Sequence, residues 1–126
     1  MKTLLFIPFL FMCSMVIGQS SKIIGTPIKI GNLEVAQNDL PKMNWSEAKK
    51  ACANLGNGWR LPTKDELILM YKNKGKIRGL VFNAYWSSSE DDNGDVWVHS
   101  FNNGGMDDPQ RLGMYNDGNV RAVRSF

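Results

Sequence analysis

The stretch GNGWRLPTKDEL, Gly56–Leu67, decides how the chain turns into its second helix. Pro62 restricts Leu61 to an extended conformation, because the proline ring clashes with a helical residue before it. Thr63 stands where a helix N-cap belongs, and Glu66, three residues later, can reach back to the Thr63 N–H in a capping box. Such a cap contributes about 1 kcal/mol. The pattern predicts a helix that begins after Thr63.

The residues on either side of this cap predict how the segment packs. Trp59 and Leu61 are expected to point into the core, whereas Arg60, on the opposite side, is expected to pair with a carboxylate or with backbone carbonyls. KNKGK ends the predicted helix. Apolar residues recur at helical spacing along this helix and form one stripe, which consists of Leu67, Met70 and Tyr71.

MNWSEAKKACANLG predicts another helix. Asn44 can cap it, Glu47 completes a capping-box spacing, and Gly56 suits the left-handed C′ position. Cys52 is interpreted as a small buried hydrophobe, since no reactive-cysteine motif surrounds it. The buried face of this helix is expected to contain Ala48, Cys52 and Leu55.

Strands are predicted in two regions. PIKIGNLEVAQ alternates apolar and polar residues around Gly31–Asn32, which indicates an early strand pair or one kinked strand. The second half of the chain is rich in Gly, Asn, Asp, Ser and aromatic residues, and it predicts short strands with long polar connections. We expect these strands at Tyr85–Ser88, Val96–Phe101 and Val120–Phe126.

His99 is the only histidine of the chain. It alternates with Trp97 and Phe101, so the three side chains are expected on one face of a strand. We interpret His99 as a half-buried partner of the sheet rather than a metal ligand or general base, because a catalytic histidine needs a carboxylate or nucleophile beside it.

The first residues predict a signal peptide. The apolar run Leu4–Ile17 is shorter than the roughly 20 residues that span a bilayer. Val16 and Gly18 fit the −3 and −1 positions of a signal-peptidase site, so we expect cleavage before Gln19. An uncleaved anchor and a lipid anchor on Cys13 are the alternatives. We therefore expect a secreted, periplasmic or cell-surface protein without a transmembrane segment in its mature form.

The chain as a whole is the size of one domain. The 126 residues are 43% hydrophobic and include four Trp, enough for one compact core. We divide them into a signal peptide (1–18), a short polar leader (19–27) and a domain (28–126). The mature chain keeps one cysteine, which excludes an internal disulfide and a two-cysteine metal site. Its Lys and Arg residues are spread along the chain, so no nucleic-acid partner is expected.

Four motifs in order resemble one bacterial family: NWSEAKKACANLG, GWRLPTKDEL, YWSSSE and VRAVRSF. The family is the secreted domain once labelled DUF1566 and linked to the Fibrobacter succinogenes major paralogous domain, which is similar to C-type lectin-like folds. The resemblance covers Ile28 to Phe126. It implies an α+β fold with two helices, short antiparallel strands, a long loop region, and N- and C-terminal strands that meet.

The resemblance also implies which residues build the scaffold. Some relatives carry a cysteine where this chain has Ala122, and that cysteine can pair with the helix cysteine. Its absence here leaves Cys52 free. The structural-motif residues are Trp45, Cys52, Trp59, Arg60, Leu61, Pro62, Thr63, Glu66, Trp86, Arg121 and Arg124.

GWRLPTKDEL also looks like the RLPTEAEWE signature of formylglycine-generating enzymes, which share this fold superfamily. Those enzymes bind copper with a pair of active-site cysteines, whereas this mature chain has one cysteine, in the first predicted helix. The shared signature is therefore taken to mark the fold and not the chemistry.

Acidic clusters between Tyr85 and Gly118 raise the question of a metal. Calcium takes six to eight oxygen ligands, which closely spaced Asp and Asn side chains can supply. The alternative is that these are solvated turn residues. We expect no obligatory cofactor, with calcium as the candidate ion. Its candidate ligands are Asp91, Asp92, Asn93, Asp95, Asp107, Asp108, Asn116 and Asp117.

The same loop region is the expected binding surface, because loops on a rigid scaffold are where such folds vary and bind. The candidate ligand-binding residues are Trp97, Asn102, Asn103 and Tyr115. We expect a binding module that recognises an extracellular glycan or protein. A structural or assembly domain of the bacterial envelope is the alternative. An enzyme comes third, since no nucleophile–base pair or phosphate-binding glycine loop is present.

Overall fold

The computed structural model describes residues 20–101 and 110–126, which form an α+β fold. The predicted signal peptide lies outside the described residues. The helices are α2 (Trp45–Ala53), α3 (Lys64–Lys72) and the 3₁₀ turn η2 (Lys74–Lys76). The strands are β1 (Ile28–Ile30), β2 (Leu33–Val35), β3 (Leu40–Met43), β4 (Ala84–Glu90), β5 (Val96–Ser100), β6 (Gln110–Leu112), β7 (Gly118–Val120) and β8 (Val123–Ser125).

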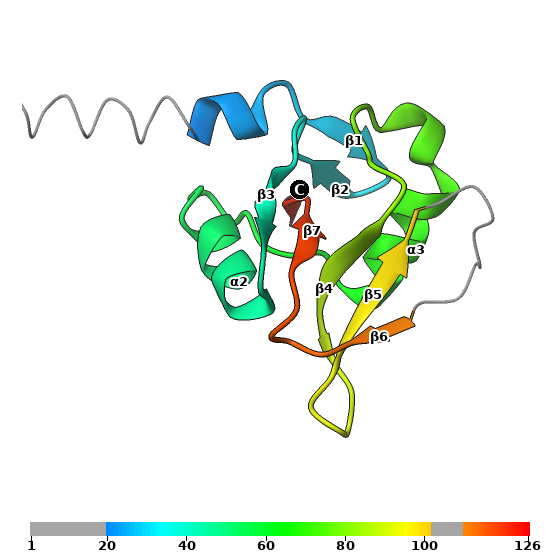
Figure 1. The fold of residues 1–126 in the computed structure, drawn as a ribbon. Coiled ribbons are helices and arrows are strands. Elements are labelled where there is room, and N and C mark those ends of the chain that lie inside the picture. Colours follow the sequence, from blue (N-terminus) through cyan, green and yellow to red (C-terminus); the bar gives the residue numbers. More distant parts are fainter. Residues whose placement is uncertain (1–19, 102–109) are drawn as a thin grey trace, which may run out of the picture.

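The strands form two sheets (Figure 1). The first has the order β1-β2-β8, so the first and last strands of the domain share one sheet, as expected. The second has the order β3-β7-β4-β5-β6. All strand pairs are antiparallel except β4 with β7, which is parallel at Tyr85 and Asn119. The predicted early strand pair is the β1–β2 hairpin, where Gly31 has a φ of 57°.

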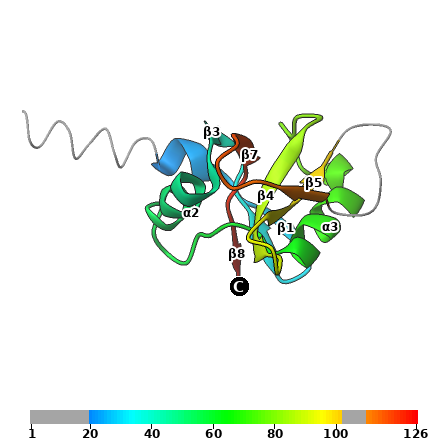
Figure 2. The same ribbon diagram turned by 60° about the horizontal axis from the view of Figure 1, so that its bottom comes forward.

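The two helices lie on opposite sides of the sheets (Figure 2). One core cluster, beside α2, contains Trp45, Ala48, Cys52, Trp59 and Trp86. The other, beneath α3, contains Leu67, Met70, Tyr71, Tyr85 and Phe101. Three of the four tryptophans are thus buried, and they are the three that the resemblance assigns to the scaffold. Among the described residues, no helix has the length and apolar character that a bilayer crossing requires.

Several boundaries differ from the sequence prediction. β3 and β6 were not expected, because β3 contains Pro41 and both are short edge strands, where proline is tolerated. The predicted last strand is two strands, β7 and β8, in different sheets. Residues 20–24 of the expected polar leader are helical, and Ile24 packs on the core.

The first helix also ends earlier than expected. Asn44 caps α2 by accepting from the Glu47 N–H at 3.0 Å, while the Glu47 side chain is exposed. Asn54 is the C-cap, so Gly56 lies two residues beyond it and is not the C′ residue. Gly56 nevertheless has a φ of 77°, which favours glycine.

The capping box of α3 is joined to an ion pair. The Thr63 hydroxyl accepts from the Glu66 N–H at 3.2 Å, and Glu66 Oε1 accepts from the Thr63 N–H at 2.8 Å. Both Glu66 oxygens also accept from Arg60, at 2.6 and 2.9 Å. Burial alone raises the pKa of Glu66, but the bonds from Arg60 and Thr63 and the Arg60 charge lower this pKa overall.

We predict that Glu66 makes stability depend on acid pH. Its folded-state pKa lies below the ordinary 4.5, so its contribution is complete above that pH and is lost as the pH falls through the folded value. Glu66→Ala should cost about 1–2 kcal/mol at neutral pH. Glu66→Gln keeps the cap and loses the ion pair, so its deficit relative to wild type should shrink in acid. Urea unfolding across this pH range measures both.

The matched control is Glu47→Gln, which changes an exposed first-turn carboxylate of α2. A Glu66→Gln deficit that stays constant from neutral pH into acid would contradict the assignment.

Arg121 forms the main buried polar network. It is 1% exposed, and its Nε donates to Asp39 Oδ1 at 2.5 Å. Asp39 Oδ2 accepts from the Tyr85 hydroxyl at 2.6 Å. Burial and the bond to Asp39 raise the pKa of Tyr85, so this hydroxyl stays protonated and donates. The other guanidinium nitrogens donate, at 3.0 to 3.2 Å, to the carbonyls of Ala36, Gln37 and Arg78.

Arg121→Ala should destabilise the fold by about 3–5 kcal/mol, because it leaves the Asp39 carboxylate without its cationic partner and removes the guanidinium donors of three carbonyls. Arg124→Ala is the control, since Arg124 is partly exposed and lies 3.5 Å from Glu34. Its loss should cost less than about 1 kcal/mol. Urea unfolding followed by tryptophan fluorescence compares them, and equal costs would contradict the role given to Arg121.

Candidate functional site

Two cationic side chains lie against the indole of Trp97, on β5. Lys64 Nζ, at the start of α3, is 4.5 Å from the indole centroid. The guanidinium carbon of Arg111, on β6, is 5.8 Å away, and Arg111 is the direct cross-strand neighbour of Trp97. The indole is half-buried, which makes Trp97 the least buried of the four tryptophans. Cations near an indole face are attracted to it, so these contacts hold the ring in place.

The capping stretch positions Lys64 over this ring. The Ser88 N–H donates to the Pro62 carbonyl at 2.7 Å, and the Lys64 N–H donates to Ser89 Oγ at 3.1 Å. The start of α3 is therefore fastened to the end of β4. A segment that the sequence marks as scaffold thus contributes one side chain to the candidate surface.

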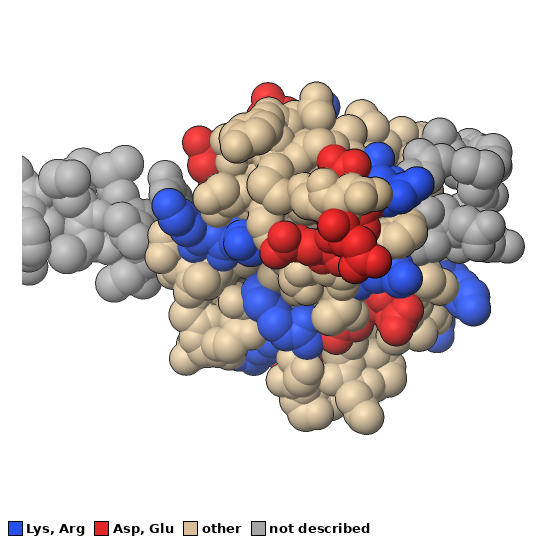
Figure 3. Space-filling view, turned by 90° about the horizontal axis from the view of Figure 1, so that it is seen from below, with Lys and Arg blue, Asp and Glu red and all other residues tan. Residues whose placement is uncertain are grey.

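The acidic turn between β4 and β5 is closed by its own side chain. Asp91 Oδ1 accepts from the Asn93 and Asp95 N–H groups, both at 2.9 Å, and Gly94 has a φ of 82°. Asp91 Oδ2 lies 3.5 Å from Arg111 Nη1. Partial burial raises the pKa of Asp91, but these backbone bonds and Arg111 lower this pKa overall. Figure 3 looks onto this end of the molecule and shows acidic side chains grouped together with basic ones around them.

The other candidate calcium ligands lie apart from this turn. Asn116 donates from Nδ2 to the Gly113 carbonyl at 3.1 Å within the β6–β7 turn, and Asp117 beside it is exposed. Asp107 and Asp108 lie outside the described residues. In residues 20–101 and 110–126, no three His, Cys, Asp or Glu side chains group in a way that could hold a metal. Calcium binding stays a prediction.

The candidate ligand-binding residues are only partly described. Asn102 and Asn103 lie outside the described residues. Tyr115 is 93% exposed and follows Met114, whose carbonyl accepts from the Trp45 N–H at the start of α2. Tyr115 therefore lies next to α2, whereas Trp97 lies next to α3. The structure does not bring these two aromatic rings into contact.

His99 is buried, not half-buried as the sequence suggested. Its ring stacks on Tyr71 at 4.5 Å and meets Phe101 edge-on at 5.5 Å. Nδ1 lies 3.0 Å from the Ser100 carbonyl, so a proton on Nδ1 satisfies that carbonyl. Nε2 has no hydrogen-bond partner within the described part of the chain. The strand alternation was predicted correctly, but α3 covers this face completely at His99.

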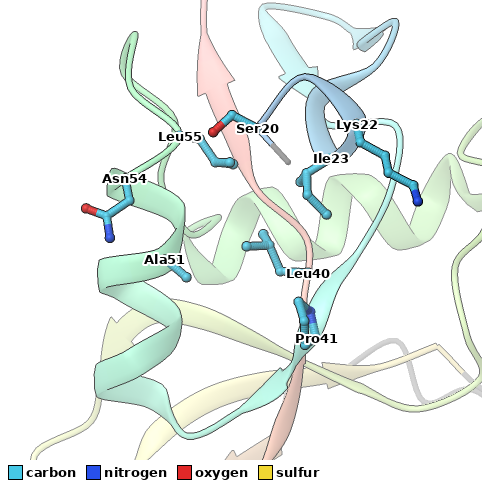
Figure 4. Close-up of a pocket in the computed structure, with 8 residues that line it drawn as sticks. All are labelled: Ser20, Lys22, Ile23, Leu40, Pro41, Ala51, Asn54 and Leu55. Atoms are coloured by element: carbon cyan, nitrogen blue, oxygen red, sulfur yellow. The ribbon is translucent and has the colours of Figure 1, made fainter. Parts of the chain in front are cut away.

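A groove that the sequence did not reveal lies between the N-terminal helical turn, β3 and the end of α2 (Figure 4). Its volume is about 450 Å³. Ile23 and Ile24 were the available signal, because two apolar residues are unusual in a polar leader. The groove is lined by Ser20, Lys22, Ile23, Leu40, Pro41, Ala51, Asn54 and Leu55.

The sequence of this domain matches a known protein family. A family model described as the Lcl C-terminal domain matches residues 26–124. The chain belongs to the Lcl C-terminal domain family. This match covers both sheets and both core helices. A search of curated protein sequences finds no match.

Solved structures show that this Lcl C-terminal domain has a C-type lectin-like fold. One similar structure is EMS16, an antagonist of the collagen receptor integrin α2β1, with a TM-score of 0.59 and 14% identity over 79% of this chain and 97% of that one. Another is botrocetin, with a TM-score of 0.53 and 16% identity over 80% and 96% of the two chains. At these identities the likeness concerns the fold alone.

Cys52 lies in the core of this Lcl C-terminal domain. It and Ala122 belong to the same buried cluster, which fits the cysteine pair that the resemblance gives to some relatives. Burial raises the pKa of the Cys52 thiol to about 12. The thiol is therefore uncharged at neutral pH and shielded from solvent.

We predict that folded protein protects Cys52 from alkylation. Iodoacetamide at mildly alkaline pH should modify it only after unfolding, because the thiolate is the reacting form. Cys13→Ser in the full chain leaves Cys52 as the only cysteine. Adding Ser46→Cys, at an exposed position of α2, supplies a control thiol that should react in the folded state. Mass spectrometry distinguishes the two, and equal labelling rates would contradict the prediction.

Proposed function

We propose that this domain is a secreted or cell-surface binding module that recognises an extracellular glycan or protein. The observation that supports it best is the half-buried indole of Trp97 with Lys64 and Arg111 against it. The fold buries the other three tryptophans. The part of the indole left exposed, together with the charged donors held against the ring, offers apolar contact and hydrogen bonds to one ligand.

The fold class agrees with a binding role. EMS16 is described as an antagonist of an integrin, so this fold binds a protein in that case. The turn of Asp91, the ring of Trp97 and Arg111 meet at the end of the β4–β5–β6 ribbon, where their side chains are fixed by mutual contacts. Such preorganisation lowers the entropy lost on binding.

The finer parts of the proposal rest on the sequence. The predicted signal peptide supports export and sets the start of the leader, 19–27. The extent of the resemblance sets the domain, 28–126. The four motifs support the finer family label, DUF1566 and the Fibrobacter succinogenes major paralogous domain. Calcium would have a role in binding only if the acidic loops hold it. A structural or assembly role in the envelope is the alternative function, and an enzyme is the third.

A glycan array probed with and without calcium tests the proposal. Trp97→Ala should weaken binding to any recognised glycan by about tenfold or more, since central aromatic residues dominate such contacts. Arg111→Ala should weaken it less, because Arg111 is largely exposed. Calcium-dependent binding would assign the acidic loops to a metal-assisted site.

Phe126→Ala is the matched control, because Phe126 is an exposed aromatic residue at the end of the other sheet. Binding that survives Trp97→Ala unchanged would remove Trp97 from the ligand surface. A silent array together with stable oligomers, or one envelope protein recovered by cross-linking, would favour the assembly role.

A further inference from the structure

A strongly basic segment runs from the last residue of α3, through η2, to the start of β4. Residues 72–83, here called the basic loop, carry four exposed cations, Lys72, Lys74, Lys76 and Arg78. No Asp or Glu occurs between Glu66 and Glu90. The chain has a formal charge of +3, of which these four contribute +4, so the remainder carries −1. The excess charge that looked evenly spread in the sequence is thus concentrated here.

These cations are not used for internal ion pairs. Within the described residues, none of the four forms a salt bridge with a carboxylate. Lys74 Nζ lies 3.9 Å from the Tyr71 ring centroid. In residues 20–101 and 110–126, no carboxylate therefore neutralises any of these four charges.

The basic loop also exposes two neighbouring apolar side chains. Phe82 is 67% exposed and Val81 is 43% exposed, whereas Leu80 packs on the core beneath α3. An exposed aromatic residue beside an exposed aliphatic one loses hydrophobic free energy unless a partner covers them. Cations bordering such a pair match the composition of surfaces that lie on membranes.

The core holds the basic loop in this conformation. The Val81 N–H donates to the Tyr85 hydroxyl at 2.9 Å, and the Asn83 N–H donates to the Val81 carbonyl at 2.9 Å. Phe82 is the middle residue of this tight three-residue turn, so it lies at the tip. The Arg78 carbonyl accepts from Arg121 at 3.1 Å. Phe82 is thus presented outward by a buried network.

The charges of the molecule are separated along β4. The basic loop precedes this strand, and the acidic turn follows it, so the two lie at opposite ends of β4 (Figure 1). The acidic end carries four carboxylates and two cations, so negative charge is in excess there. The carboxylates belong to Glu90, Asp91, Asp92 and Asp95, and the cations are Lys64 and Arg111. An anionic surface would attract one end and repel the other, and this orients the molecule.

We propose that the basic loop docks the domain on an anionic membrane surface. Phe82 and Val81 would enter the interface, while the four cations face the lipid headgroups. A soluble polyanion would satisfy the cations equally well, but it offers no apolar layer for Phe82. An anionic bilayer accounts for both the cations and the exposed apolar side chains of the basic loop.

This orientation is compatible with a ligand surface around Trp97 and does not depend on it. Trp97 lies near the start of β5, next to the acidic turn. With the basic loop against the membrane, this end faces away from it. The docking and the ligand contact would therefore use opposite ends of the domain.

Vesicle sedimentation tests the proposal. Wild type should bind phosphatidylcholine vesicles that contain phosphatidylglycerol, and high salt should weaken this binding. The triple variant Lys72→Gln, Lys74→Gln, Lys76→Gln should bind about 100-fold more weakly, at about fivefold per lysine. Phe82→Ser should lose about tenfold. All variants keep the same N-terminus, so any binding by the first residues is common to them.

Two matched variants complete the experiment. Lys42→Gln, Lys49→Gln, Lys50→Gln removes the same charge from β3 and α2, and Phe126→Ser removes another exposed aromatic ring. Both should bind as wild type does, with unchanged circular dichroism. Equal losses in the two triple variants would assign the binding to net charge and overturn the proposal. If wild type does not bind the anionic vesicles, the proposal is also overturned. It is likewise overturned if the protein binds heparin, loses this binding in the Lys72, Lys74, Lys76 triple variant and keeps it in Phe82→Ser.

Discussion

The buried guanidinium of Arg121 is the interaction on which the fold depends. Removing a charge from water is costly unless its hydrogen-bond donors are paired, and Arg121 meets this demand with Asp39 and three backbone carbonyls. Its acceptors belong to the β2–β3 connection and to the basic loop. Because the guanidinium is planar and its donors have fixed directions, these separate segments are held in one arrangement. Tyr85 extends the same network from β4.

Arg121 stands where the chain passes from one sheet to the other. β7 ends at Val120 in the five-stranded sheet and β8 begins at Val123 in the three-stranded one. Close packing fixes β7 as well: a Cβ on Gly118 would lie 2.6 Å from the indole nitrogen of Trp86. That nitrogen donates to the Met43 carbonyl at 2.8 Å and so ties β4 to β3 across β7. Glycine is required there because the backbone lies directly against the ring.

Local chemistry was predictable from the sequence, and long-range pairing was not. The capping box, the apolar stripe of α3 and the β1–β2 hairpin depend on residues within a few positions of one another. Arg121 and Asp39 are 82 residues apart, so no spacing rule joins them. Trp97 was a candidate ligand-binding residue from the sequence, but its neighbours Lys64 and Arg111 come from other elements. The basic loop was not predicted as a charged surface, because its cations alternate with uncharged residues and form no continuous run in the sequence. That these cations lack carboxylate partners is visible only in the fold.

The capping stretch has a second consequence beyond starting α3. Pro62 and Lys64 are bonded to Ser88 and Ser89, so the helix start is fixed to the end of β4 next to the acidic turn. This places Lys64 against Trp97. At the other end of β4, Tyr85 and Arg121 hold the basic loop. One central strand thus fixes two surfaces, one basic and one predominantly acidic. Scaffold residues therefore determine function here by setting which side chains meet at each end, although none of them needs to touch a ligand.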